Sequence, residues 1–389
     1  MRKVYMDYGS AAPLDPRVIE AMTPFLTEQL GNPSSLHSRG HIAKRALEES
    51  RAAVSVLFGI EDPAQLIFTS GASESNNLAI LGTVNRNKDK GNHIVASAIE
   101  HMSVLNPCKD LLKHGFEVSL VPVDREGFVD IERIKNEIRK ETILVSMMYA
   151  NSEIGTIEPI QEIGKIAREK EIYFHVDGTA ACGKIPIDVE RDNIDLLTIS
   201  SNDMYGPQGV GALYIRKGVR SQPIAFGGGQ ERGLRSGTEN IAAIVGMAEA
   251  AEIASTEMET ESKRLSVLRD QLIDEVLNSI DEAYLTGSRT KRLPNNASFR
   301  FSYIEGESII LNLDMMGVSA ASGSACTSKT LEPSHVLIAL GLRHEEAHGS
   351  LLFTLGKENM SEDVDYVLEI LPGIISKLRA MSPLAPRKE

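Results

Sequence analysis

The chain has 389 residues, of which 42% are hydrophobic, enough for one large domain and a smaller one with buried cores. Its formal net charge of −13 argues against nucleic acid or an anionic membrane as a partner, because phosphate contacts need clustered Lys and Arg. No apolar run has the length of a membrane span or a signal peptide. The cysteines Cys108, Cys182 and Cys326 form no CxxC pair, which suggests a reducing compartment. We therefore expect a cytoplasmic protein that binds neither nucleic acid nor membrane.

Short apolar runs alternate with helical patterns through the first half of the chain. Helical spacing of apolar residues is found, for example, over 75–87 and 160–170. Strands that alternate with helices predict an α/β fold with a mostly parallel central sheet and helices on both faces. The predicted strands are 66–70, 93–97, 117–123, 142–150, 173–178, 195–201 and 211–216.

The pattern changes in the last third of the chain. A long helix is predicted over 240–278, followed by a strand over 297–304 and helices over 332–341 and 361–380. This change predicts a second domain. We expect a large α/β domain over 16–255, and a smaller α+β domain formed by 1–15 and 256–389 that carries Cys326.

Chemically suggestive residues follow several predicted strands, where ligands bind in open parallel sheets. The segment TSGASESNN (69–77) runs from a strand into a helix. It would form either a phosphate site or an ordinary helix start with Ser73 as N-cap. His101 and Asp177 also follow strands, and each alone would more often cap a strand end than act in catalysis. Cys326 lies among small polar residues in SGSACTSKT, which weakens its interpretation as a buried hydrophobe.

Ordered matches to one family run nearly from end to end. The chain resembles the NifS/IscS-like cysteine desulfurases, in the class V aminotransferase branch of fold-type I pyridoxal-phosphate (PLP) enzymes. The resemblance implies the fold-type I transferase fold, a homodimer, L-cysteine as candidate substrate and a role in iron–sulfur cluster assembly. The matching segments include YMDYGSAAPLDPRV (5–18), TSGASESNN (69–77), FHVDGTAACGKIPID (174–188), GGGQERGLRSGTEN (227–240) and SGSACTSKTLEPSHVL (322–337).

The resemblance also implies roles for individual residues. Asp177 would pair with the pyridinium nitrogen of PLP, and His101 would stack on its ring. Cys326 would attack the substrate sulfur and carry the persulfide, so Cys326 and His101 are the expected catalytic residues. The PLP phosphate would be surrounded by Ala72, Ser73, Ser200 and the partner subunit's Thr238.

Several positions depart from the family pattern, which indicates an atypical member. Asp203 stands where the family has the lysine that forms the Schiff base with PLP, and an aspartate has no amine. Leu352 stands where an arginine would grip the substrate carboxylate. Three further cofactor-site positions also differ: Asn202 replaces a histidine, Ser152 an asparagine and Ala180 a glutamine.

These departures leave three hypotheses open. In the first, the protein docks an IscU-type scaffold and uses Cys326 to deliver sulfur or to ligate a nascent cluster, for example [2Fe-2S], with desulfurase activity weak or lost. PLP would then be noncovalent, weakly bound or absent. In the second, the protein is an active desulfurase that converts L-cysteine to L-alanine with noncovalent PLP. In the third, it is a non-catalytic structural partner.

Overall fold

The computed structural model describes residues 2–323 and 333–385, so Cys326 lies outside the described residues. Its centre is a seven-stranded sheet with the strand order β2-β8-β7-β6-β5-β3-β4. Only β8 runs in the opposite direction to the other six strands, so the prediction of a mostly parallel sheet is confirmed. The strands are β2 (Leu66–Thr69), β3 (His93–Ser97), β4 (Glu117–Val121), β5 (Thr142–Met148), β6 (Tyr173–Asp177), β7 (Leu196–Ser200) and β8 (Gly211–Ile215).

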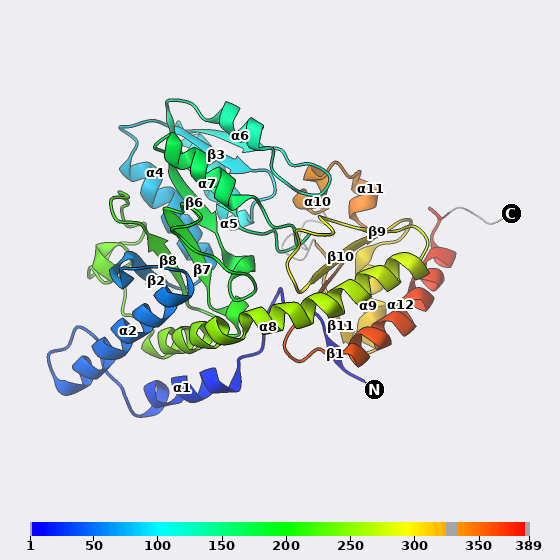
Figure 1. Cartoon of the computed structure of the whole chain (residues 1–389), viewed down its shortest axis with the longest axis horizontal. Helices are drawn as coiled ribbons and strands as arrows, with labels where there is room; N and C mark the ends of the chain where they lie inside the picture. Colours follow the sequence, from blue (N-terminus) through cyan, green and yellow to red (C-terminus); the bar gives the residue numbers. More distant parts are fainter. Residues whose placement is uncertain (1, 324–332, 386–389) are drawn as a thin grey trace.

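Helices cover both faces of this sheet, as predicted (Figure 1). Alternate residues of each strand point to opposite faces. On β2, for example, Leu66 and Phe68 join the core beneath one set of helices, whereas Ile67 joins the core beneath the other. The first set is α1 (Pro16–Thr27), α2 (Ser38–Leu57), α6 (Ile131–Glu137), α7 (Ile160–Glu169) and the start of α8 (Ile241–Ser279). The second set is α3 (Ala72–Asn77) with its continuation η2 (Leu78–Gly82) and α4 (Thr83–Arg86), together with α5 (Met102–Lys113).

Helix α8 connects this part to a smaller one (Figure 1). It has 39 residues; Ile244 and Met247 pack in the core of the large sheet, and Leu272 and Val276 pack in a separate core. The predicted boundary at 255/256 falls inside this helix and stays a prediction. The smaller part holds the sheet β12-β10-β9 and the strand pair β1-β11. Its elements are β1 (Val4–Tyr5), β9 (Ala283–Leu285), β10 (Asn296–Phe301), α9 (Gly306–Met315), β11 (Val318–Ser319), α10 (His335–Ala339), α11 (His344–Ala347), β12 (Ser350–Thr354) and α12 (Ser361–Met381).

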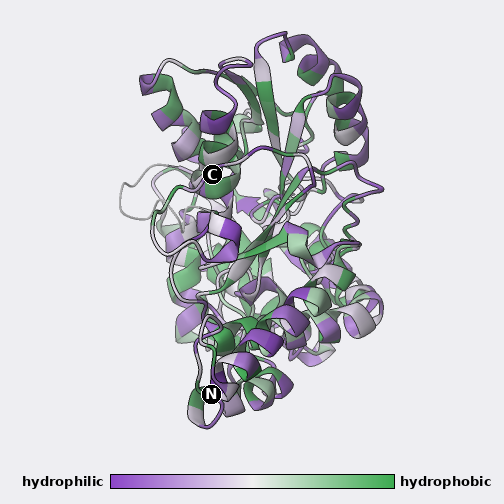
Figure 2. Ribbon diagram, turned by 90° about the vertical axis from the view of Figure 1, so that its left-hand side faces the viewer, coloured by the Kyte–Doolittle hydropathy of each residue, from purple (hydrophilic) through white to green (hydrophobic). Residues whose placement is uncertain are grey.

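Hydrophobic residues concentrate on the central strands, which run between helices with hydrophilic outer stretches (Figure 2). This distribution is the one that burial of apolar surface favours. Within residues 2–323 and 333–385, none of the helices has the length and apolar character needed to cross a bilayer.

Candidate functional site

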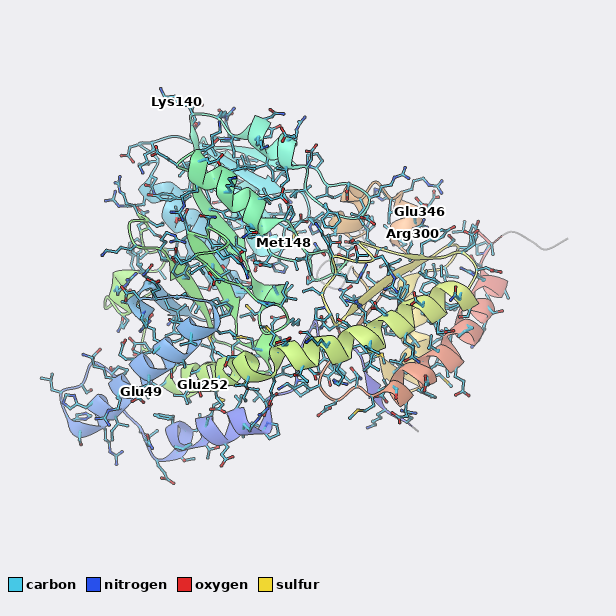
Figure 3. All side chains as sticks on the ribbon, in the orientation of Figure 1. Glu49, Lys140, Met148, Glu252, Arg300 and Glu346 are labelled. Atoms are coloured by element: carbon cyan, nitrogen blue, oxygen red, sulfur yellow. The ribbon has the colours of Figure 1, made fainter. Side chains whose placement is uncertain are left out.

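The carboxyl ends of the parallel strands bring the predicted cofactor residues to one edge of the sheet. His101 is the N-cap of α5, just after β3, and Asp177 is the last residue of β6. Met148, labelled in Figure 3, ends β5 on the side of the large sheet that faces the smaller part of the chain. Ser152 follows β5 after a short turn, and Ser200 ends β7.

Hydrogen bonds connect Asp177 to the segment 69–77 and to His101. Asn76 on α3 donates through Nδ2 to Asp177 Oδ2 at 2.7 Å and to Ser103 Oγ at 2.8 Å. Ser103 Oγ in turn lies 2.7 Å from His101 Nδ1. The backbone N–H of Thr179 donates to Asp177 Oδ1 at 3.0 Å. The Asp177 carboxylate is therefore buried and fixed in position by neutral donors, the Asn76 amide and the backbone N–H of Thr179.

Behind Asp177 lies His175, which the sequence analysis did not single out. Its Nδ1 lies 2.8 Å from Ser146 Oγ and its Nε2 lies 3.1 Å from Thr198 Oγ1, and the side chain is fully buried. Burial lowers the pKa of His175, which keeps the ring neutral at physiological pH. His175 stands inside the almost wholly buried strand β6, and no motif in the sequence distinguished it from its apolar neighbours.

The start of α3 forms the candidate phosphate site. Gly71 is the N-cap with φ 145°, and no side chain caps the helix, so Ser73 is not its N-cap. Backbone N–H groups at a helix N-terminus that lack internal partners are suited to an anion. A Cβ on Gly211 of β8 would lie 2.7 Å from Gly71 Cα, so this close approach requires glycine. Ala72 and Ser73 begin this helix, whereas Thr238 is exposed on the loop before α8.

Asp203 forms an ion pair that the sequence analysis missed. It lies in η4 (Asn202–Met204), and its Oδ1 is 3.1 Å from Lys184 Nζ. The side chains of Lys184 and Asp203 are only 14% and 12% exposed. Lys184 follows η3 (Thr179–Ala181), which contains Ala180, and no periodicity in the sequence indicated that it would meet Asp203. The amine of Lys184 is thus engaged in an ion pair with Asp203.

A cavity of about 130 Å³ lies between the two parts of the chain, next to His101 and Ser152. Leu352 lines it and is 8% exposed, with its backbone N–H and C=O both bonded to Ala321 at 2.8 and 3.0 Å. Burial raises the pKa of two lining carboxyls, Glu100 and Glu153, to about 8. Among the described lining residues there is no lysine or arginine; the charged or titratable ones are Asp7, Glu100, His101, Glu153 and His335.

The donor set fits PLP in its ring and phosphate but not in a covalent attachment. Three buried polar atoms without hydrogen-bond partners belong to residues that bond Asp177 or neighbour Asp203: Asn76 Oδ1, Thr179 Oγ1 and Asn202 Oδ1. Buried polar atoms normally have partners, so a polar ligand is expected there. Asp177 is suited to a protonated ring nitrogen, but the residue at 203 offers no amine.

Comparison with known proteins agrees with this geometry. The family model for class-V aminotransferases matches residues 4–367. The chain is 58% identical over 383 residues to cysteine desulfurase IscS 1 of Archaeoglobus fulgidus, covering 98% of this chain and 100% of that protein. It is 52% identical over 382 residues to cysteine desulfurase IscS of Dictyoglomus turgidum, covering 98% and 97%. A solved NifS-like protein superposes with a TM-score of 0.91 at 37% identity, covering 97% of this chain and 100% of the other. The chain therefore belongs to the class-V aminotransferase family, among the NifS/IscS-like cysteine desulfurases.

Proposed function

We propose that this protein serves iron–sulfur cluster assembly through Cys326, as a homodimer docked on an IscU-type scaffold in the cytoplasm. Cys326 would deliver sulfur or ligate a nascent cluster such as [2Fe-2S], and desulfurase activity would be weak or lost. The names of the related cysteine desulfurases support the family role.

The proposed loss of activity rests on the charged groups around Leu352 and Asp203. The cavity beside Leu352 has acidic side chains and no described lysine or arginine on its walls. A substrate carboxylate entering it would lose its water without gaining a cationic partner, which is costly. At the other position, Asp203 holds Lys184 in an ion pair. Residue 352 therefore offers no cation for the substrate carboxylate, and residue 203 offers no amine for PLP.

The remaining cofactor residues would still hold PLP weakly. Asp177, positioned by Asn76, would accept a hydrogen bond from the protonated ring nitrogen, and the start of α3 with Ser200 would hold the phosphate. When bound, PLP supplies an electron sink for the substrate carbon. His101, fixed through Ser103, would cover the ring and exclude water.

The other cysteines are poor candidates for thiol chemistry. Cys108 and Cys182 are 2% and 0% exposed, and burial raises the pKa of each to about 12. A buried thiol with so high a pKa forms little thiolate, which is the reactive and ligating form. This leaves Cys326 as the thiol for sulfur delivery or cluster ligation.

The test is anaerobic reconstitution with iron, sulfide and an IscU-type scaffold, followed by absorption and iron content. Cys326→Ser is expected to abolish the protein's contribution, whereas the matched variant Cys108→Ser is expected to leave it intact. Normal assembly with Cys326→Ser would overturn the proposal and favour a purely structural partner.

A second function, an active desulfurase with noncovalent PLP, is favoured by the hydrogen-bonded Asp177 region and by the names of the relatives. The purified protein with added PLP would then show a cofactor absorption band and release sulfide and alanine from L-cysteine. A bound cofactor without alanine formation would rule this function out.

A further inference from the structure

A buried ion pair between Arg51 and Glu231 joins the loop over 227–240, which precedes α8, to helix α2. Arg51 Nη1 and Nη2 donate to the two carboxylate oxygens of Glu231, each at 2.8 Å. Both side chains are buried. Two parallel hydrogen bonds between a guanidinium and a carboxylate fix orientation as well as distance. The pair therefore determines where this loop lies, although neither residue has a part in the proposed function.

The same pair bonds the free edge of β2, which is the strand at one end of the large sheet. Arg51 Nη1 also donates to the carbonyl of Leu66 at 2.7 Å. The Oε2 atom of Glu231 also accepts from the backbone N–H of Phe68 at 2.7 Å. An edge strand presents backbone groups that have no partner strand. The ion pair satisfies two of these groups, so β2 and the loop are held against each other.

The loop has an unfavourable backbone conformation where Glu231 enters the pair. Glu231 and Arg232 begin η5 (Glu231–Gly233), and their φ angles are 46° and 56°. Residues other than glycine rarely adopt positive φ, and two in succession persist only where surrounding contacts impose that conformation. The bonds from the Glu231 carboxylate to Arg51 and to β2 impose it here. The loop is therefore held in one preset conformation.

A second ion pair joins the same loop to the turn after β2. Arg235 Nε lies 3.0 Å from Glu74 Oε1, and the two side chains are 23% and 21% exposed. Glu74 Oε2 accepts from the backbone N–H of Ser70 at 2.6 Å. Glu74 thus bonds across the turn at which the chain leaves β2 and enters α3. The loop contacts segment 69–77 and its approach on both sides of this turn, at Phe68 and at Glu74.

Segment 69–77 leads directly to the candidate cofactor residues. Asn76 lies two residues after Glu74 on α3, and its amide donates to Asp177 at 2.7 Å. The other carboxylate oxygen of Asp177 accepts from the backbone N–H of Thr179. Because Glu74 and Asn76 belong to one short helix, a displacement of Glu74 would move Asn76 and weaken its bond to Asp177.

We propose that Glu231 and Arg235 are positioning residues for the cofactor region: they fix segment 69–77 and so maintain the bond between Asn76 and Asp177. Neither residue needs to touch the cofactor for this role. The inference rests on the proposed role of Asp177 as the partner of the PLP ring nitrogen.

The first test is hydrogen exchange of backbone amides in the full chain without added cofactor, measured by mass spectrometry. Arg235→Gln removes a partly exposed ion pair, whose loss costs little stability. We expect the amide of Thr179 to exchange at least about threefold faster than in wild type, because the Asp177 carboxylate that it bonds is less well fixed. Arg235→Lys can keep the ion pair with Glu74 and is expected to stay within about twofold of wild type. Unchanged exchange at Thr179 in Arg235→Gln would overturn the proposal.

Arg300→Gln is the matched control. Arg300 and Glu346, labelled in Figure 3, form an ion pair at 3.5 Å in the smaller part of the chain, with side chains 16% and 26% exposed. Loss of this pair is expected to leave exchange at Thr179 unchanged. Equal acceleration by Arg300→Gln and Arg235→Gln would indicate a general loss of stability and would overturn the proposal.

A double variant tests whether Arg235 acts through Asn76. Asn76→Leu removes the amide that donates to Asp177 and is expected to accelerate exchange at Thr179 by itself. Adding Arg235→Gln to Asn76→Leu is expected to accelerate it by less than about 1.5-fold more, because the connection is already broken. Independent, multiplicative effects of the two substitutions would contradict this route.

Glu231→Gln tests the buried pair, since it keeps an acceptor for Phe68 but removes the charge that Arg51 needs. We expect exchange at Thr179 to be at least about threefold faster than in wild type. If this variant does not fold, Arg51→Lys, which keeps the positive charge but not the paired hydrogen bonds, takes its place with an expected acceleration of at least about twofold. A wild-type exchange rate in the folded variant would overturn the role of Glu231.

Titration with PLP, followed by absorption, connects these results to the cofactor. Arg235→Gln is expected to raise the Kd for PLP at least about threefold, and Arg235→Lys to leave it within about twofold of wild type. An unchanged Kd in Arg235→Gln would overturn the proposal. No binding of PLP by wild type would count against the proposed function alone, because exchange at Thr179 is measured without the cofactor.

Discussion

The Asp177 and Asp203 sides of the cofactor region each place a carboxylate at the same edge of the sheet, with different partners. Asp177 accepts from neutral donors, Asn76 and the backbone N–H of Thr179, and unpartnered polar atoms lie nearby. Asp203 is paired with the ammonium group of Lys184. The Asp177 carboxylate is suited to the cationic ring nitrogen of a bound cofactor. The charge of Asp203 is already neutralised by Lys184 of the same chain. The comparison teaches that the partner, more than the residue type, decides what a carboxylate can do.

The largest expected effect comes from converting the Asp203 side back to a lysine site. Asp203→Lys should bind PLP covalently, because a second ammonium beside Lys184 favours the neutral, reactive amine. Combined with Leu352→Arg, it should raise alanine formation from L-cysteine at least about 100-fold over wild type. Borohydride trapping and mass spectrometry locate the modified lysine. Equal turnover with Asp203→Lys alone would show that the arginine matters less than proposed.

Breaking the internal ion pair should cost stability. Lys184→Met leaves Asp203 mostly buried without a cation, and we expect a loss of about 2–4 kcal/mol in the free energy of unfolding. Urea denaturation measures this loss. The double variant Lys184→Met with Asp203→Leu should regain most of it, and a double variant as unstable as the single one would contradict the neutralisation described above.

On the Asp177 side, Asn76→Leu removes the donor shared by Asp177 and Ser103. We expect a loss of about 1–3 kcal/mol, because both partners remain buried or partly buried with a bond unmade. PLP affinity, measured by titration, should fall as well. Asn77→Ala on the same helix is the control, since the Asn77 amide donates to the backbone carbonyls of Ser73 and Ser103 instead of to Asp177. An equal loss of PLP affinity in both variants would argue for a general helix effect.

The smallest expected effect is a change in the pH dependence of stability at Glu158, whose carboxylate accepts from the backbone N–H of Val129 and from neither aspartate's partners. Burial raises the pKa of Glu158 from 4.5 to about 8, so the folded state binds a proton that the unfolded state has released between these values. Its contribution to stability therefore declines as the pH rises from about 5 to 8. Relative to wild type, Glu158→Gln should gain at least about 1 kcal/mol over this interval. Urea denaturation at both pH values checks this, and parallel profiles would show that the carboxyl ionises freely.

Much of the fold could be predicted from local pattern. The predicted strands of the central sheet all occur, with ends that differ by a few residues, as at 142–150 against β5 (Thr142–Met148). The long helix predicted over 240–278 is α8 (Ile241–Ser279). Burial on a sheet or helix face leaves a periodic trace in the sequence, so the strands that Asp177 and Ser200 end, and the strand that His101 follows, could be predicted for the same reason. The roles of these residues stay predictions.

The sequence by itself determined the family, the strands and helices, and the chemical fact that residue 203 carries no amine. Only the tertiary structure decided that Lys184 pairs with Asp203, that Asn76 joins Asp177 to His101 through Ser103, and that Glu231 meets both Arg51 and Phe68. The physical reason is that periodicity reports which face of one element is buried. The neighbours of a side chain depend on the strand order of the sheet and on the turns that return distant segments to the same edge.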